Sequence, residues 1–285
     1  MVYFTVIHGE LWEHRPAANR LTAFYLWMAT GGALGTFVAS ILAPWLLVNG
    51  QELALSVLAL PIAWVVVSYR FLEGNFKNIA AVGALAVTSV SAYQVWSTFQ
   101  DLNAHAVLTR RNFYGRCIVN DSPQVQLLFN GVTCHGIQFH DPDKSRQATS
   151  YFSWQGGVGR SFMYLRKARP QGSSVGVVGL GIGILASYTQ PNDTMKFYEI
   201  DPKVIDIANQ PFLYLRQALG KVQIVQGDAR LELEKNQDTY DMLVVDAFSG
   251  DAIPTHLLDN EVMAIYRKHL KPEGIIAFHI SNRYL

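Results

Sequence analysis

The sequence has few cysteines, little net charge and almost no charged residues in its first third. Two cysteines in 285 residues, Cys117 and Cys134, are too few for a disulfide framework and lack the spacing of a metal site. A formal net charge of +1 excludes the basic footprint of a nucleic-acid-binding protein, so we expect no nucleic-acid partner. No basic segment precedes a short apolar core at the N-terminus, which therefore lacks the pattern of a cleavable signal peptide.

The missing charges are concentrated in the first hundred residues. Of the 45 charged residues, only eight lie among positions 1–100. Three segments there carry no charged side chain: Leu21–Val48, Leu53–Tyr69 and Ile79–Phe99. The first and third exceed the ~20 residues that a helix needs to span a bilayer, and the second is marginal. We therefore expect about three transmembrane helices in residues 1–100 and a multi-pass protein of the bacterial inner membrane.

The sidedness of this membrane region stays open. Basic residues precede the first segment (Arg15 and Arg20) and lie between the second and third (Arg70 and Lys77). The positive-inside rule places these stretches in the cytoplasm, and three spans would then put the rest of the chain outside. An external location conflicts with a cofactor site of the cytosolic kind.

Beyond residue 100 the pattern changes to short β-rich segments. A small β domain over residues 101–150 is expected to contain a meander of three strands: Phe113–Val119, Val125–Phe129 and Val132–Phe139. Cys117 and Cys134 lie in its first and third strands, where a disulfide and two buried thiols are both open. His135 and His140 lack the spacing of metal ligands, and we interpret them as hydrogen-bonded strand residues.

The most informative stretch is Val175–Asp201, which predicts a strand, a glycine turn, a helix and a second strand. Gly179, Gly181 and Gly183 follow the first strand, and Glu199 comes twenty residues after Gly179. This is the layout of a nucleotide-binding βαβ unit, in which a carboxylate accepts hydrogen bonds from the ribose. The spacing G-x-G-x-G favours ligands of the S-adenosylmethionine type over dinucleotides.

The alternation of strands and helices continues to the end of the chain. We expect a helix at Tyr151–Ala168, a second that begins at Pro202 and is capped by Asp201, and a third at Glu261–His269. Further strands are expected at Lys221–Val225, Tyr240–Val245 and Gly274–Ile280. This order predicts a doubly wound, Rossmann-like parallel sheet over residues 151–285. Ligands bind beyond the carboxyl ends of such strands. The glycine turn, Glu199, Asp228 and Asp246 all fall at these ends, so we expect a joint ligand site.

At these residues the sequence resembles the polyamine aminopropyltransferases, the spermidine synthase family, and in particular its membrane-anchored branch. The resemblance covers about Asn112 to Leu285 and rests on these segments: FYG (Phe113–Gly115), NGVTCHGIQ (Asn130–Gln138), GLGIG (Gly179–Gly183), YEIDP (Tyr198–Pro202), QGDAR (Gln226–Arg230) and VVDAFSGDAIP (Val244–Pro254). Two N-terminal segments, HGEL and FYLWMATGGALG, look like the fused membrane proteins as well.

The resemblance implies a site and a reaction. Glu199 would hold the ribose of decarboxylated S-adenosylmethionine, Asp228 would contact its adenine, and Asp246 would receive a proton from the attacking amine. Tyr151 and Asp251 would position a cationic, putrescine-like acceptor, and Gln138 matches a substrate-side glutamine. The resemblance implies a co-substrate but no prosthetic group and no metal, and it leaves room for a homo-oligomer.

Three departures from the family pattern keep other functions open. Ile182 stands where the family's turn carries an acid that binds the donor amine. Ser153 replaces an acceptor-binding glutamate, and Asp251 lies five residues after Asp246 rather than three. An S-adenosylmethionine-dependent methyltransferase and a non-catalytic module that senses an adenosyl metabolite or polyamine are therefore the alternatives. The family continues beyond the fifth strand, so we expect the chain to be a fragment.

Overall fold

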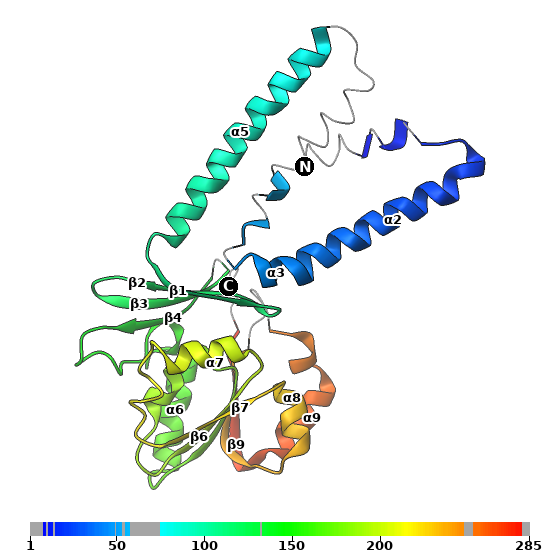
Figure 1. Ribbon diagram of the computed structural model, residues 1–285. Coiled ribbons are helices and arrows are strands. Elements are labelled where there is room, and N and C mark those ends of the chain that lie inside the picture. Colours follow the sequence, from blue (N-terminus) through cyan, green and yellow to red (C-terminus); the bar gives the residue numbers. More distant parts are fainter. Residues whose placement is uncertain are drawn as a thin grey trace. The chain divides into compact units, whose positions relative to one another are not determined.

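The chain forms two compact units in the computed structural model (Figure 1). The structure describes residues 8–9, 11–13, 15–48, 50–52, 55–57, 75–131, 133–247 and 253–280. The first unit contains Met1–Ala104 with Arg111–Phe113, and the second contains His105–Arg110 with Tyr114–Leu285. The strands after residue 113 and the α/β part thus belong to one unit, and the division into three domains at residues 100 and 150 stays a prediction.

The first unit contains one continuous apolar helix, Ala18–Leu46. It is made of η1 (Ala18–Arg20), α2 (Leu21–Phe37), the π-helical turn η2 (Val38–Leu42) and α3 (Ala43–Leu46). Among the described residues this 29-residue helix alone is long and apolar enough to cross a membrane. The expectation of about three spans is therefore wrong for the described part of the chain.

Of the other two predicted spans, one forms a helix and the other lies mostly outside the described residues. α5 (Asn75–Asn103) covers the segment Ile79–Phe99 as a helix of 29 residues, but it is less apolar than the first helix because serine, threonine and glutamine interrupt it. The segment Leu53–Tyr69 lies outside the described residues except for positions 55–57.

The second unit begins with a four-stranded antiparallel sheet. Its strands, in spatial order, are β1 (Ala106–Asn112), β2 (Gly115–Asp121), β3 (Val125–Asn130) and β4 (Thr133–Phe139). The meander is confirmed, but β1 was not predicted, because paired arginines interrupt its apolar pattern. Cys117 lies opposite Asn130 and Cys134 opposite Phe129, on either side of β3. Two strand spacings separate the cysteines by roughly 10 Å, so both are free thiols.

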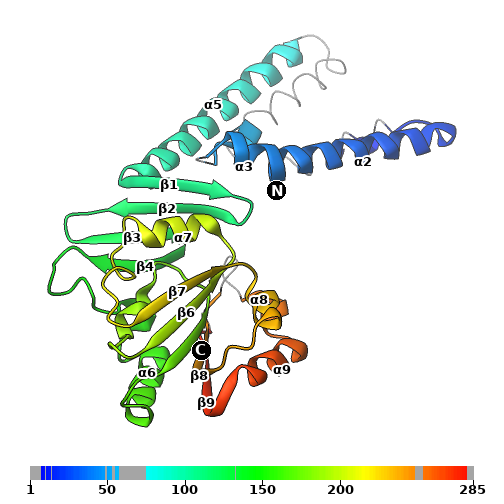
Figure 2. The same cartoon turned by 60° about the horizontal axis from the view of Figure 1, so that its bottom comes forward.

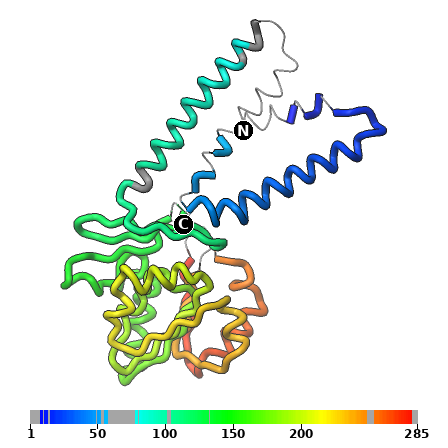
Figure 3. Tube along the Cα trace, viewed as in Figure 1, coloured from blue at the N-terminus to red at the C-terminus, as the bar shows by residue number. Residues whose placement is uncertain are grey.

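A five-stranded parallel sheet forms the rest of this unit. Its order is β7-β6-β5-β8-β9, and its strands are β5 (Ser174–Val178), β6 (Thr194–Glu199), β7 (Lys221–Gln226), β8 (Tyr240–Val245) and β9 (Leu270–Phe278). Figure 3 traces the path of the chain through this part, from green at the residues of α6 to red at those of β9. The doubly wound sheet is confirmed. The order reverses between β5 and β8, where ligands bind in this architecture.

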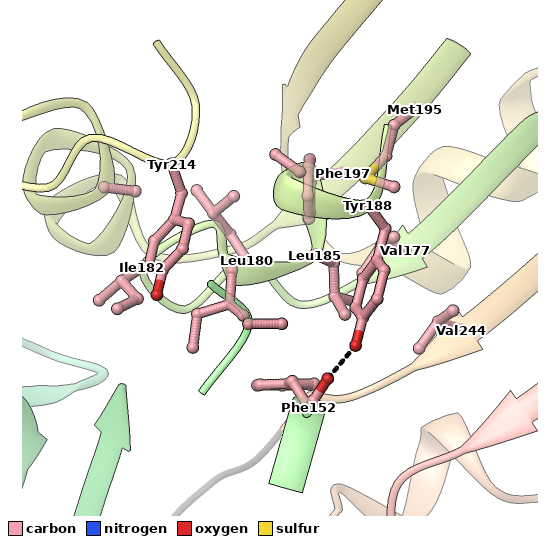
Figure 4. Close-up of a cluster of buried hydrophobic side chains, with 14 of the residues drawn as sticks. Phe152, Val177, Leu180, Ile182, Leu185, Tyr188, Met195, Phe197, Tyr214 and Val244 are labelled. Carbon is pink, nitrogen blue, oxygen red and sulfur yellow. Dashed lines mark hydrogen bonds between the residues drawn. The ribbon is translucent and has the colours of Figure 1, made fainter. Parts of the chain in front are cut away.

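Helices cover both faces of the sheet (Figure 2). On one face, α6 (Gly157–Ala168) and α7 (Pro202–Asn209) pack against alternate strand residues such as Val177 and Phe197. On the other face, α8 (Ala229–Lys235) and α9 (Asn260–Lys268) pack against the intervening residues. Figure 4 shows part of the first cluster, in which the buried Tyr188 hydroxyl donates a hydrogen bond to the carbonyl of Phe152. Two-sided burial explains why the central strands β5 and β8 are almost entirely apolar, whereas the edge strand β7 alternates apolar with polar residues.

Two predicted helices differ from the observed ones. The first turn of the predicted helix Tyr151–Ala168 is a separate 3-10 turn, η3 (Ser150–Phe152), and Gly156 caps α6. A Cβ at Gly156 would lie 2.2 Å from the Tyr151 carbonyl oxygen, so a close backbone approach defines this break. The predicted helix after the glycine turn is only the five-residue 3-10 helix η4 (Ile184–Tyr188).

Candidate active site

A cleft of about 340 Å³ opens at the carboxyl ends of the parallel strands in the second unit. The sheet contributes the predicted residues Gly179, Gly181, Glu199, Asp228 and Asp246, and η3 contributes Tyr151. The facing antiparallel sheet contributes Cys117, Leu128, Asn130 and His135 from its strands and Tyr114 from the turn between β1 and β2. The structure therefore brings most of the predicted site residues to one cleft.

The glycine turn passes very close to the end of β8. Gly179 has a φ of +98°, and a Cβ at this position would lie 2.4 Å from the carbonyl oxygen of Asp246. Its N–H donates to the Tyr198 carbonyl at 2.9 Å, which ties the turn to β6 as well. Only glycine satisfies both the conformation and the contact. The turn and Asp246 thus form one rigid edge of the cleft.

Glu199 ends β6 and turns its carboxylate back toward the glycine turn. Its Oε2 accepts a hydrogen bond from the Leu180 N–H and its Oε1 accepts one from the Asp201 N–H, both at 2.9 Å. Burial raises the pKa of Glu199, and these backbone hydrogen bonds lower it. Each carboxylate oxygen has a second lone pair. Glu199 is therefore held in position with acceptor capacity for a ligand hydroxyl.

Asp228 has two partners at the end of β7. Its Oδ1 accepts from the Leu231 N–H at 3.2 Å and caps α8, while its Oδ2 lies 2.9 Å from Nε2 of His256. His256 comes from η5 (Thr255–Leu257) and lines the cleft. Asp228 thus combines a structural role as a helix cap with a position at the ligand-binding edge.

Asp246 ends β8 and pairs with a histidine from the end of β9. Its Oδ1 lies 2.5 Å from Nδ1 of His279, and only 13% of its side chain is exposed. Burial raises the pKa of Asp246, whereas the hydrogen bond and charge of His279 lower it. The His279 ring in turn stacks on Tyr151, with ring centroids 3.9 Å apart. Burial and the negative charge of Asp246 raise the pKa of Tyr151, so its hydroxyl is protonated at neutral pH.

Gln138 and Gly183 do not line the cleft. The Gln138 amide donates to the Ser145 carbonyl and accepts from the Leu213 N–H, each at 2.8 Å, and the side chain is buried. Both of its polar atoms hold the loops around the meander, and its role as a ligand-binding residue stays a prediction. Gly183 instead caps η4, where its missing side chain leaves room for Leu215. Asp251 lies outside the described residues.

The histidines of the meander are not arranged as metal ligands. His140 lies 2.7 Å from Asp121 Oδ1, as expected for a hydrogen-bonded strand residue. His135 lines the cleft. Within the described ranges no group of three or more His, Cys, Asp or Glu residues could hold a metal ion.

Two curated proteins are similar to this chain in sequence. A polyamine aminopropyltransferase of Vibrio vulnificus is 30% identical over 124 residues, which are 40% of this chain and 41% of that protein. A probable polyamine aminopropyl transferase of Bifidobacterium longum is 27% identical over 37% of this chain and 23% of that protein. The chain is related to the spermidine synthase family. It spans less than half of the length of these two relatives, and no model of a protein family matches it.

The fold agrees with this relationship. A solved structure of a probable spermidine synthase from Corynebacterium glutamicum superposes with a TM-score of 0.50 at 16% identity, over 60% of this chain and 62% of that one. At this identity the likeness concerns the fold alone. The Rossmann-like architecture of the spermidine synthase family is thus present in the second unit.

Several cleft residues were not identified from the sequence. His256 and His279 pair with two of the three predicted acids, and Cys117 and Asn130 face them from the meander. His279 lies at the end of the predicted fifth strand, Gly274–Ile280, and directly after the observed β9, at the same carboxyl edge as Asp246, so its position in the pattern was available as a signal. His256 lies in the three-residue helix η5, which is too short for a periodic signal in the sequence.

Proposed function

We propose that the chain is a membrane-anchored aminopropyltransferase, which transfers an aminopropyl group from decarboxylated S-adenosylmethionine to an amine. The observation that carries this proposal is the single cleft in which the glycine turn, Glu199 and Asp246 meet. Glu199 accepts hydrogen bonds from the ribose hydroxyls, and Asp228 accepts one from the adenine amino group. Tyr151 and Asp251 contact the acceptor. These roles follow the family, to which the chain is related over about two fifths of its length.

Asp246 acts as the proton acceptor. An ammonium group has no lone pair for attack, so one proton of the acceptor passes to the Asp246 carboxylate. The amine nitrogen then forms a bond to the methylene carbon next to the sulfonium. The carbon–sulfur bond breaks, and its electron pair stays on sulfur as a neutral thioether. Burial of Asp246 raises its pKa and so strengthens it as a base.

The experiment is to incubate the full chain with decarboxylated S-adenosylmethionine and a panel of amines, and to analyse the products by mass spectrometry. We expect a product heavier by one aminopropyl group, together with the thioether. Asp246→Asn should lose this product by about 10²-fold or more. Binding of the donor without any product would instead favour the non-catalytic sensing module.

One observation favours a methyltransferase as the second candidate. Ile182 is 1% exposed and lies in the wall of the cleft, inside the glycine turn, where an acid would contact a donor amine. Its apolar side chain provides no partner for the charged amine of the decarboxylated donor. The same assay with S-adenosylmethionine decides between the two, because a product heavier by one methyl group would replace the aminopropyl product.

Membrane anchoring is the part of the proposal that rests on the first unit. The helix Ala18–Leu46 is apolar around its whole circumference, and within the chain only Ala43 of it is buried. Large side chains such as Trp27 and Trp45 are more than 70% exposed. An all-round apolar helix needs an apolar environment, and a lipid bilayer supplies one. Membrane fractionation of the full chain tests this point.

A further inference from the structure

The strongest unassigned feature of the cleft is the array of Asp246, His279 and Tyr151. The His279 N–H donates to the Val245 carbonyl at 2.9 Å, which extends the ladder between β8 and β9 and holds His279 beside Asp246. The rings of Tyr151 and His279 lie nearly parallel, with an interplanar angle of 18°. The histidine ring is thus fixed by its backbone, by stacking and by the contact between Nδ1 and the Asp246 carboxylate.

In this arrangement the two carboxylate oxygens of Asp246 have different partners. Oδ1 of Asp246 is engaged by His279 at 2.5 Å. Among the described residues no hydrogen bond engages Oδ2, although Asp246 is largely buried and lines the cleft. Oδ2 is not among the fully buried side-chain atoms that lack a partner, so it keeps some exposure, and on a residue that lines the cleft it can accept a hydrogen bond from a ligand. An amine in the cleft is a donor of the required kind.

We infer that His279 is the positioning residue for Asp246: it holds Oδ1, so that Oδ2 faces the amine whose proton Asp246 accepts. This inference rests on the proposed function and adds a residue to it. His279 does not contact the reacting atoms in this role. Without the histidine, the Asp246 carboxylate would lose its orientation and also the interaction that favours its charged form.

The titratable groups around this pair come from several elements. Tyr151 of η3 stacks on His279, and Cys134 of β4 contributes to the electrostatics of Tyr151. The other titratable residues of the cleft lie on other strands, turns and loops: Glu199, Asp201, Asp228, His135, His256, Cys117, Tyr114 and Tyr198. Of all these groups, His279 is the one whose hydrogen bond and charge lower the pKa of Asp246.

The test compares two substitutions of His279 in the full chain. His279→Asn places an amide N–H near the position of Nδ1 and keeps the hydrogen bond without a titrating ring, whereas His279→Leu removes both. We expect His279→Leu to lower kcat at neutral pH by about tenfold or more and to move the acidic limb of the kcat profile to higher pH. His279→Asn should restore most of the activity. His140→Leu, which breaks an exposed histidine–aspartate pair outside the cleft, is the matched control and should leave kcat unchanged.

A second readout needs no turnover. In protein carrying ¹³C-labelled aspartate, the midpoint of the Asp246 carboxyl titration should rise in His279→Leu and stay close to the native value in His279→Asn. A native midpoint and a native kcat profile in His279→Leu would overturn the inference. Absence of any transfer product would instead overturn the proposed function, and the carboxyl titration would still decide whether His279 controls Asp246.

Discussion

Gly136 of β4 lies directly against Ile182 of the glycine turn. A Cβ at Gly136 would lie 2.6 Å from the Ile182 side chain, which is 1% exposed. The missing side chain in the meander is therefore what makes room for isoleucine in the turn. The two residues couple the antiparallel sheet to the ligand-binding edge of the parallel sheet.

This contact predicts that Gly136→Ala destabilises the protein. The added methyl group overpacks the site and should lower the free energy of unfolding by about 1–3 kcal/mol. Gly157→Ala is the control, because a Cβ there meets nothing within 4 Å. It lies in the first turn of α6 and should be neutral or stabilising by up to about 1 kcal/mol. Urea unfolding measures both variants, and equal stability of the two would contradict the packing argument.

A substitution at Asp228 should separate helix capping from ligand binding. Asparagine caps helices as well as aspartate does, so Asp228→Asn should change stability by only a few tenths of a kcal/mol. It loses the charged acceptor, and we expect adenosyl-ligand affinity to fall by about tenfold, the effect of one charged hydrogen bond. Asp259→Asn makes the same change at the cap of α9, outside the cleft lining. Calorimetric titration of both variants checks the prediction, which fails if both bind the ligand equally well.

The sequence predicted the centre of the sheet well because β5 and β8 are buried on both faces. Tyr240–Val245 is apolar except for Asp241, and its observed bounds match the predicted ones. The segment after Gly183 misled the prediction, because its apolar residues form a five-residue 3-10 helix and not an α-helix. Local pattern does not determine where tertiary contacts end an element.

Those residues of the candidate site whose positions depend only on the topology of the sheet were predictable from the sequence. Glu199 ends β6 and Asp246 directly follows β8, and these two strands flank β5 in the parallel sheet, so both acids lie at the same carboxyl edge. The place of Gln138 outside the cleft lining was not predictable, because the partners of its amide, Ser145 and Leu213, lie seven and 75 residues away in other loops. Such hydrogen bonds leave no periodic signal.

The exposed apolar helix of the first unit gives a prediction about membrane association. Leu34 lies near the middle of Ala18–Leu46 and is 60% exposed. An arginine at the centre of a spanning helix costs about 2.5–3.5 kcal/mol, so Leu34→Arg should shift the chain from the membrane to the soluble or aggregated fraction. Tyr164→Arg on α6 is the control, with the same exposed fraction in the second unit. Retention of Leu34→Arg in washed membranes at the native level would count against the helix as an anchor.

Asp246 should make the protein less stable as the pH rises. Burial raises its pKa in the folded state above the ordinary value of 3.8, so the folded protein prefers the protonated carboxyl. The stability from this group is fully present below the pKa of the unfolded chain and is lost as the pH rises through the folded-state pKa. Asp246→Asn has no carboxyl to ionise and should escape this loss. In thermal unfolding from pH 4 upward, the Tm of the variant should rise relative to the Tm of the native protein as the pH increases. The transfer activity of the variant should stay low. A constant difference in Tm across this range would show that ionisation of Asp246 does not oppose folding.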